Sequence, residues 1–118
     1  MPNLPEHLAL GVAGEDAAFF ELRRKGYTVV ARRWASGDVP GDIDLIAWQG
    51  PMLCFIEVKA RAHDRAALES VGARQRARIE RAASLYVAGK PALARKGMRF
   101  DIITVAPFPR HIRDAWRP

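Results

Sequence analysis

Charged residues interrupt two neighbouring apolar segments, and this placement constrains the fold more than any other feature of the chain. Residues 41–48 and 52–60 are rich in β-branched, aromatic and aliphatic side chains, as strands inside a sheet are. Yet the first segment contains Asp44, and the second contains Glu57 and Lys59. Buried without partners, each charge would cost several kcal/mol. The three side chains must therefore pair with one another, reach solvent or hold a metal ion.

The register of a hairpin between these segments decides whether the three charges meet. Side chains alternate along a strand, so Glu57 and Lys59 share one face. Asp44 joins that face if it lies opposite Glu57, a register that leaves residues 49–52 as a four-residue loop and keeps Pro51 out of the paired region. A three-residue loop without a bulge would put the two acids on opposite faces. The sequence thus permits a shared site without requiring it.

The rest of the chain predicts one α/β domain over residues 1–118. Gly26, after a basic turn, indicates the end of a first helix, and Gly89 indicates the end of a second. The expected elements are a helix over residues 8–24, a strand over 27–34, the hairpin, a helix over 68–87 and a strand over 99–106, with a short tail from Pro107. The order α-β-β-β-α-β predicts a mixed β-sheet flanked by helices.

The charge balance favours an anionic partner. Nineteen Lys and Arg residues against thirteen Asp and Glu give a formal net charge of +6. Such an excess suits a nucleic acid or a membrane surface, although solubility alone is an alternative reason for it. No apolar run approaches the roughly 20 residues of a membrane span, and the N-terminus does not resemble a signal peptide, so we expect a cytoplasmic protein without a membrane partner. Because Cys54 is the only cysteine, the chain can form neither an intramolecular disulfide nor a cysteine-based zinc site.

Each predicted helix carries a polar residue within its apolar stripe. The stripes consist of Leu8, Val12, Phe19 and Leu22 in the first helix and of Val71, Ile79, Ala82 and Tyr86 in the second. Glu15 and Gln75 fall on these stripes at helical spacing. One such residue is commonly a satisfied structural hydrogen bond. Two of them, beside three charges on adjacent strands, indicate a common polar site.

Two acids, with a lysine two residues after the second, form the pattern of a magnesium-dependent phosphodiesterase site. Mg²⁺, or Mn²⁺ in its place, takes oxygen ligands and uses one or two carboxylates together with water and substrate phosphate. We expect Asp44 and Glu57 as ligands, the Val58 carbonyl as a third, and Glu15 bound through water or orienting the others. Lys59 would position the nucleophile and stabilise charge on the phosphate. The alternative is a salt bridge on an exposed sheet face, because short acid-x-lysine matches arise by chance.

Arginines gather on one side of the second predicted helix. Arg74, Arg78 and Arg81 fall on one helical face, where they are either simply solvated or contact a phosphate backbone. Arg33 and Arg61, on either side of the hairpin, are further candidates for contact with nucleic acid.

These residues lie in motifs that resemble the YraN-like family of small bacterial proteins. The motifs are Gly14-Glu15, Gly26-Tyr27, residues 41–47 around Asp44, residues 55–61 around Glu57 and Lys59, Gln75, and Arg99-Phe100-Asp101. The family is similar to archaeal Holliday-junction resolvases, so the resemblance implies a restriction-endonuclease-like fold. It also implies that Asp44, Glu57 and Lys59 form the nuclease triad, assisted by Glu15 and Gln75. Two departures are Asp42, where the family usually has Glu, and the lack of the family's Phe-Gly segment between residues 62 and 68.

Residues and resemblance together predict a Mg²⁺- or Mn²⁺-dependent nuclease that hydrolyses phosphodiester bonds in DNA, with branched or junction DNA as a candidate substrate. One small chain holds one site, so the cutting of two strands predicts a homodimer on the substrate. Two alternatives stay open. One is a nucleic-acid-binding protein of the same fold that cleaves nothing, and the other is an interaction module whose charge recruits an acidic protein.

Overall fold

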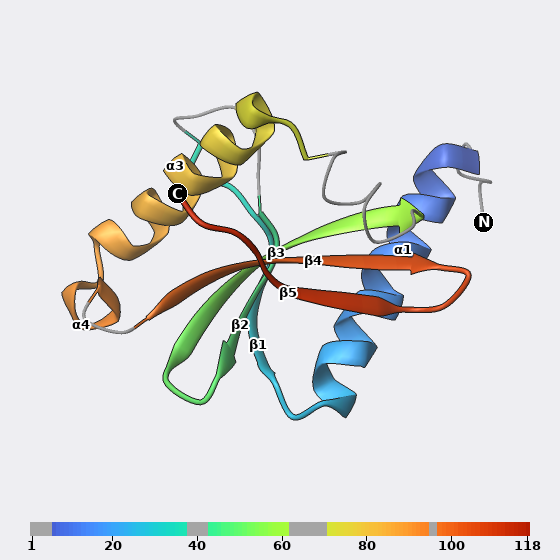
Figure 1. The fold of residues 1–118 in the computed structure, drawn as a ribbon, viewed down its shortest axis with the longest axis horizontal. Coiled ribbons are helices and arrows are strands. Elements are labelled where there is room, and N and C mark those ends of the chain that lie inside the picture. The colour runs from blue at the N-terminus through green and yellow to red at the C-terminus, as the bar shows by residue number, and fades with distance from the viewer. Residues whose placement is uncertain (1–5, 38–42, 62–70, 95–96) are drawn as a thin grey trace.

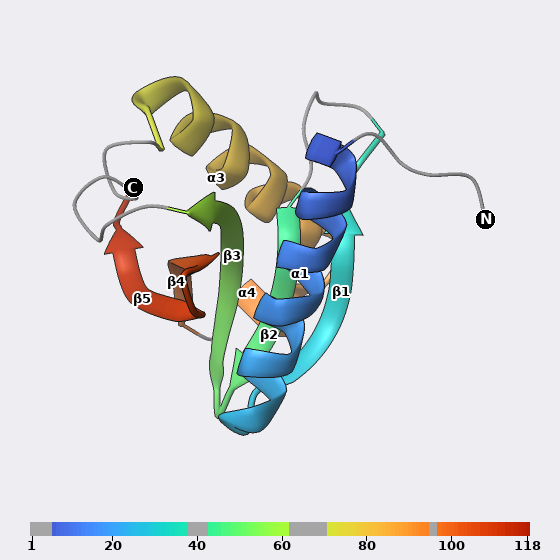
Figure 2. The ribbon, with the colours of Figure 1, turned by 90° about the vertical axis from the view of Figure 1, so that its right-hand side faces the viewer.

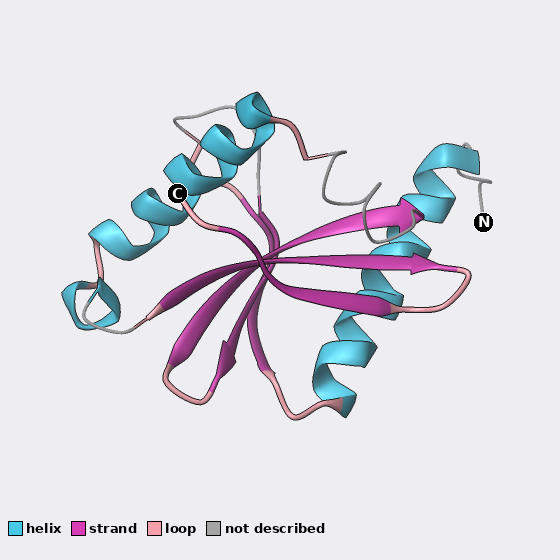
Figure 3. Cartoon of the chain, viewed as in Figure 1, coloured by secondary structure: helices cyan, strands magenta, loops and turns pink. Residues whose placement is uncertain are grey.

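A computed structural model describes residues 6–37, 43–61, 71–94 and 97–118, in which helices flank a five-stranded β-sheet (Figures 1 and 3). The elements are α1 (Glu6–Arg24), β1 (Thr28–Trp34), β2 (Ile43–Gln49), β3 (Met52–Arg61), α3 (Ala73–Ala88), α4 (Pro91–Ala94), β4 (Met98–Ala106) and β5 (Arg110–Trp116). The expected α/β class, a mixed sheet flanked by helices, is confirmed. The start of the second helix, expected at Leu68, lies outside the described residues. No helix within them is long and apolar enough to cross a membrane.

The strands follow one another across the sheet in chain order, and only one pair among them is parallel. β3 and β4 run parallel, whereas the other three neighbouring pairs are antiparallel. A parallel pair cannot be joined by a tight turn and needs a crossover connection. That connection carries α3 and α4 over one face, while α1 packs on the other (Figure 2).

β3 shows how the sheet serves two cores. Leu53 and Phe55 belong to the cluster under α3, whereas Cys54 and Ile56 belong to the cluster under α1. Burial raises the pKa of the Cys54 thiol to about 11, as befits the small buried apolar residue that the sequence predicts. The same alternation, continued by two residues, brings Glu57 to the face that α3 covers.

The β2–β3 hairpin has the register that the shared site requires but a shorter loop than predicted. Gln49 pairs with Met52 and Leu45 with Ile56, so Asp44 falls opposite Glu57. The connection is therefore a two-residue turn rather than a four-residue loop. Gly50 at its first position has a φ of 56°, a conformation that tight two-residue hairpins use and glycine readily adopts.

The tail expected from Pro107 is wrong, because residues 110–116 form strand β5 beside β4. The two prolines at 107 and 109 end one element, and the strongly polar segment that follows has no clear alternation to indicate another. Tertiary contacts stabilise this strand, although its sequence has no strand-like alternation. The Trp116 ring stacks on Phe100 with 5.2 Å between centroids and fills the core under α3.

Candidate active site

The acidic site begins where the β2–β3 ladder ends. The last ladder pair is Leu45 with Ile56, and two residues later the Val58 N–H donates to the Asp44 carboxylate, Oδ2, at 2.7 Å. Since the N–H and C=O of one strand residue point to the same side, the Val58 carbonyl also faces β2. The Asp44 carboxylate and the Val58 carbonyl are thus directed to the same region, as the predicted ligand set requires.

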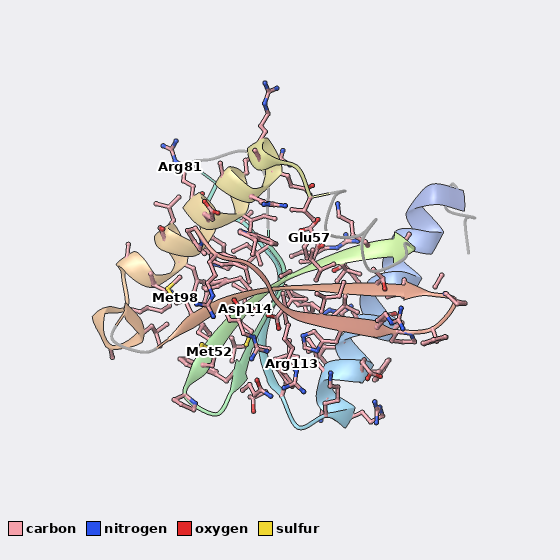
Figure 4. The ribbon with its side chains drawn as sticks, viewed as in Figure 1. Met52, Glu57, Arg81, Met98, Arg113 and Asp114 are labelled. Atoms are coloured by element: carbon pink, nitrogen blue, oxygen red, sulfur yellow. The ribbon has the colours of Figure 1, made fainter. Side chains whose placement is uncertain are left out.

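Glu57 lies in contact with Asp44 and is nearly enclosed. Its side chain is 12% exposed and lies on the α3 side of β3 (Figure 4). Burial, followed by the charge of Asp44 and a hydrogen bond between the two carboxyl groups, raises the pKa of Glu57 to about 8, although Lys59 acts in the opposite direction. Two carboxylates this close cannot both ionise cheaply without a cation between them. One of the two carboxyl groups, Glu57, therefore keeps a proton unless a cation binds beside the pair.

Gln75 joins Glu57 to Lys59. Its amide Nε2 donates to Glu57 Oε1 at 2.9 Å, and its carbonyl oxygen accepts from Lys59 Nζ at 3.3 Å. Lys59 Nζ is 3.6 Å from Glu57 Oε1, and its side chain is 22% exposed. The polar residue expected from the helix stripe thus reaches the site from the first turn of α3. The ion pair is not on an exposed sheet face, which the salt-bridge alternative assumed.

Glu15 is buried on α1, as its stripe predicts, but its partner is an arginine. Arg33 Nε donates to Glu15 Oε2 at 2.6 Å, and the β1–β2 register places Arg33 across from Asp44. Arg33 has a φ of 50°, which is uncommon outside glycine. In the described part of the chain, no three acidic, histidine or cysteine side chains gather closely enough to hold an ion. Glu15 is therefore not a direct third carboxylate beside Asp44 and Glu57 in this part of the chain. Its expected role, binding through water or orienting the other ligands, stays a prediction.

Gly14 explains how α1 comes close to the sheet beside Glu15. A Cβ atom built on Gly14 would lie 3.2 Å from the Cγ2 of Val105 on β4, tighter than ordinary contact. The glycine therefore allows the helix to approach β4 at this point, which gives the Gly14-Glu15 motif a steric reason.

The arginines predicted to form a helix face do so. Arg74, Arg78 and Arg81 are exposed, no described residue forms an ion pair with them, and Arg81 points away from the body of α3 (Figure 4). They occupy the helix that delivers Gln75 to the acidic site. The side chain of Arg61 lies outside the described residues, and Arg33 is partly engaged by Glu15.

A second polar cluster, centred on Asp101, was not predicted as such. Asp101 is fully buried and accepts a bidentate ion pair from Arg99 at 2.8 Å, a contact from His111 Nε2 at 2.7 Å and the Asp114 N–H at 2.9 Å. Burial alone would raise the pKa of Asp101, but the bonds from His111, Arg99 and Asp114 lower it overall. Lys25 Nζ lies 2.9 Å from His111 Nδ1, and because an ammonium can only donate, Nδ1 accepts and Nε2 donates to Asp101.

This cluster ties distant elements together rather than forming a second acidic site. Arg99 also donates to Gln49 at 2.6 Å and to the Tyr27 hydroxyl at 2.7 Å. The acid–cation pairing is complete, in contrast to the two facing acids at Asp44 and Glu57. The available signal was an arginine and an acid two residues apart in an apolar strand, the same pattern that marks Glu57 and Lys59.

A pocket of about 360 Å³ lies elsewhere, at the opposite end of β3. Met52, Met98 and Asp114 are among its lining residues, and Figure 4 shows all three away from Glu57. The acidic site is instead a half-buried surface of Asp44, Glu57 and Lys59. Such a site suits a polymer that lies across it better than a small molecule that must be enclosed.

Fold and site define an α/β protein with an acid–acid–lysine centre at the end of a strand ladder. The chain belongs to the UPF0102 family: the model of this family, described as an uncharacterised protein family, matches residues 14–105. The resemblance to the YraN-like family is thereby confirmed. The matched region contains both acids, Lys59, Gln75 and Glu15.

Bacterial relatives agree over nearly the whole chain. A UPF0102 protein of Paramagnetospirillum magneticum is 47% identical over 91% of this chain and 86% of its own length. UPF0102 proteins of Parvibaculum lavamentivorans and Maricaulis maris are each 44% identical, over 92% and 93% of this chain and 82% and 87% of their own lengths.

Proposed function

We propose that this protein is a metal-dependent nuclease that hydrolyses phosphodiester bonds in DNA. The observation that carries the proposal is the register that sets Asp44 opposite Glu57, so that the two carboxyl groups interact, with Lys59 beside Glu57 on the same face. A purely structural role does not explain two facing acids that raise each other's energy. We also propose that this protein is related to the restriction-endonuclease-like nucleases.

The residues present fit Mg²⁺ or Mn²⁺. Two carboxylates and the Val58 carbonyl offer the hard oxygen ligands that Mg²⁺ prefers, and this ion needs no more than one or two carboxylates. The raised pKa of Glu57 is what a site built for a cation should show in its absence. When bound, the ion would supply Lewis acidity and lower the pKa of a water molecule.

The chain's own groups then have separate tasks. Glu57 must lose its proton before it can act as a ligand, so ion binding releases a proton at neutral pH. Lys59 orients the nucleophile and stabilises charge that develops on the phosphate. Gln75 holds both side chains through its two amide atoms and is a positioning residue.

Charge and surface support DNA as the substrate. The net charge of +6 and the exposed arginine face of α3 suit a phosphate backbone. Branched or junction DNA is the proposed preferred form, and a homodimer on the substrate would supply the second site that a two-strand cut needs. A cytoplasmic location stays a prediction from the sequence.

A cleavage assay tests the proposal directly. Labelled linear, nicked and four-way-junction DNA would be incubated with the protein and Mg²⁺, Mn²⁺ or EDTA, alongside Asp44→Asn and Lys59→Met. Cutting that needs the ion and is lost in both variants supports the nuclease. The first alternative is a non-catalytic nucleic-acid-binding protein, in which the Glu57–Lys59 ion pair is structural. Salt-sensitive binding without cutting would identify it, whereas no DNA binding at all would favour an acidic protein partner.

A further inference from the structure

The turn between β4 and β5 presents an exposed aromatic ring. Phe108 lies between Pro107 and Pro109, and the residue is 59% exposed. The prolines fix the backbone φ angles on both sides, so the turn has little freedom to fold the ring back onto the core. Packing therefore does not account for a large apolar side chain at this place.

The turn lies close to the acidic site because β3 and β4 are parallel. Lys59 pairs with Thr104, and Arg61 at the end of β3 pairs with Ala106. Phe108 follows Thr104 by four residues, so at about 3.3 Å per residue it lies no more than roughly 13 Å further along the strand than Lys59. Figure 1 shows the β4–β5 turn projecting beyond the tip of β3. That distance corresponds to about four steps of a nucleic acid at roughly 3.4 Å each.

The chemistry of the turn suits a nucleobase beside a phosphate. The Arg110 guanidinium lies 6.0 Å from the centre of the Phe108 ring, and Arg110 is an exposed residue at the start of β5. Aromatic rings stack on bases that are free of their neighbours, while a cation beside the ring, here Arg110, contacts the backbone. The bases within a duplex are covered on both faces, so an unpaired base is the partner that such a ring fits.

We propose that Phe108 stacks on an unpaired base of DNA bound at the acidic site, which makes this protein selective for junctions between duplex and single strand. The inference rests on the proposed nuclease function and adds its specificity-determining residue. A protein partner fits the turn less well. The other exposed large apolar residues of the described chain, Phe20, Val30, Leu85 and Met98, lie on other elements, so this turn offers one ring rather than an interface-sized patch.

Base-analogue fluorescence tests the stacking. The probe is a forked DNA duplex with 2-aminopurine at its first unpaired position, and EDTA prevents cutting. We expect wild type and Phe108→Tyr to quench the probe, and Phe108→Ala and Phe108→Leu to leave it bright with roughly tenfold weaker binding to the fork. Binding to fully paired duplex should stay unchanged. Phe20→Ala, which removes a ring that is 65% exposed on α1, is the matched control and should behave as wild type.

The outcomes separate this inference from the function on which it rests. If wild type binds no DNA, both fall. If wild type binds DNA but Phe108→Ala quenches and binds as wild type does, only the stacking role falls. If the alanine variant instead changes the sedimentation of the free protein, the turn is a self-association surface and the inference is wrong. Should Phe108→Ala misfold by circular dichroism, the comparison of Phe108→Leu with Phe108→Tyr decides, because leucine keeps an apolar surface without the ring.

Discussion

The carboxyl groups of Asp44 and Glu57 touch each other, whereas the buried Asp101 carboxylate touches Arg99 and His111. The first arrangement raises the pKa of Glu57 and the second lowers that of Asp101. The fold therefore favours the protonated form of Glu57 and the ionised form of Asp101. Under the proposed function, Asp101 stabilises the fold and the pair of Asp44 and Glu57 binds a cation.

Replacing either facing acid should not weaken the metal-free fold. Glu57→Gln and Asp44→Asn remove the cost of keeping a proton on the facing acids while retaining shape, so we expect an unchanged midpoint or a rise of about 4 °C for each kcal/mol relieved. Added Mg²⁺ should raise the midpoint of wild type but not of the variants, and cleavage should vanish in both. Thermal melts with and without Mg²⁺ measure this. A simple salt bridge predicts the opposite, a lower midpoint when the partner of Lys59 is removed.

Glu57 should make the metal-free protein less stable as pH rises. Its pKa is about 8 in the fold against an ordinary 4.5, so the folded state keeps a proton that the unfolded state releases between these values. The free energy of unfolding should fall through this window by at most about 1.4 kcal/mol per pH unit. Urea melts of wild type minus Glu57→Gln isolate the effect from other titrating groups. A flat difference from pH 5 to pH 8 would exclude the raised pKa.

Lys59→Met should separate catalysis from metal binding. The lysine lies 3.6 Å from Glu57 and 3.3 Å from Gln75, and Gln75 still holds Glu57 by a hydrogen bond of 2.9 Å when the ammonium group is removed. We expect cleavage to fall at least about a hundredfold, as when a group that stabilises the transition state is removed, while Mg²⁺ still raises the melting midpoint. Lys59→Arg, which keeps the charge, serves as the control. Loss of the Mg²⁺ shift in Lys59→Met would assign the lysine to the ion instead.

The arginine face of α3 should govern the salt dependence of DNA binding. Changing Arg74, Arg78 and Arg81 to Ala should lower the slope of log K against log salt by about 0.9 for each phosphate that the variant no longer neutralises. The matched control replaces Arg23, Arg24 and Arg117, three exposed arginines elsewhere, of which Arg24 and Arg117 pair with Glu21 and Asp114. Fluorescence anisotropy at several salt concentrations gives both slopes. Equal slopes in the two triple variants would mean that the α3 face is merely solvated.

Asp101→Asn should destabilise the fold strongly, in contrast to Glu57→Gln. Removing the charge leaves Arg99 largely buried without its anion, which typically costs about 3–5 kcal/mol. The depressed pKa of Asp101 also means that its contribution is present above its ordinary value of 3.8 and lost as pH falls through the lower folded value. Urea unfolding checks the magnitude. A variant as stable as wild type would show that the Asp101 cluster does not hold the sheet together.

The hairpin could be predicted from the sequence because its geometry is local. Apolar composition marks β2 and β3, and the two-residue period puts Glu57 and Lys59 on one face whatever surrounds them. The observed register is the one that lets Asp44 join them, which the sequence permitted without requiring, and the turn is shorter than expected. Helical spacing likewise placed Glu15 and Gln75 toward the sheet.

Long-range contacts settled what the sequence left open. Three contacts join segments that local propensity treats separately: Arg33 binds Glu15, His111 binds Asp101, and β4 pairs with the strand that carries Lys59. Strand β5 is stabilised by its pairing with β4 and by the stacking of Trp116 on Phe100, and its own residues show no clear alternation. The sequence by itself therefore determined which side chains share a face of a strand or helix, since backbone periodicity is fixed by covalent geometry. Only the tertiary structure decided which charges meet, because that depends on how closely packed elements bring distant residues together.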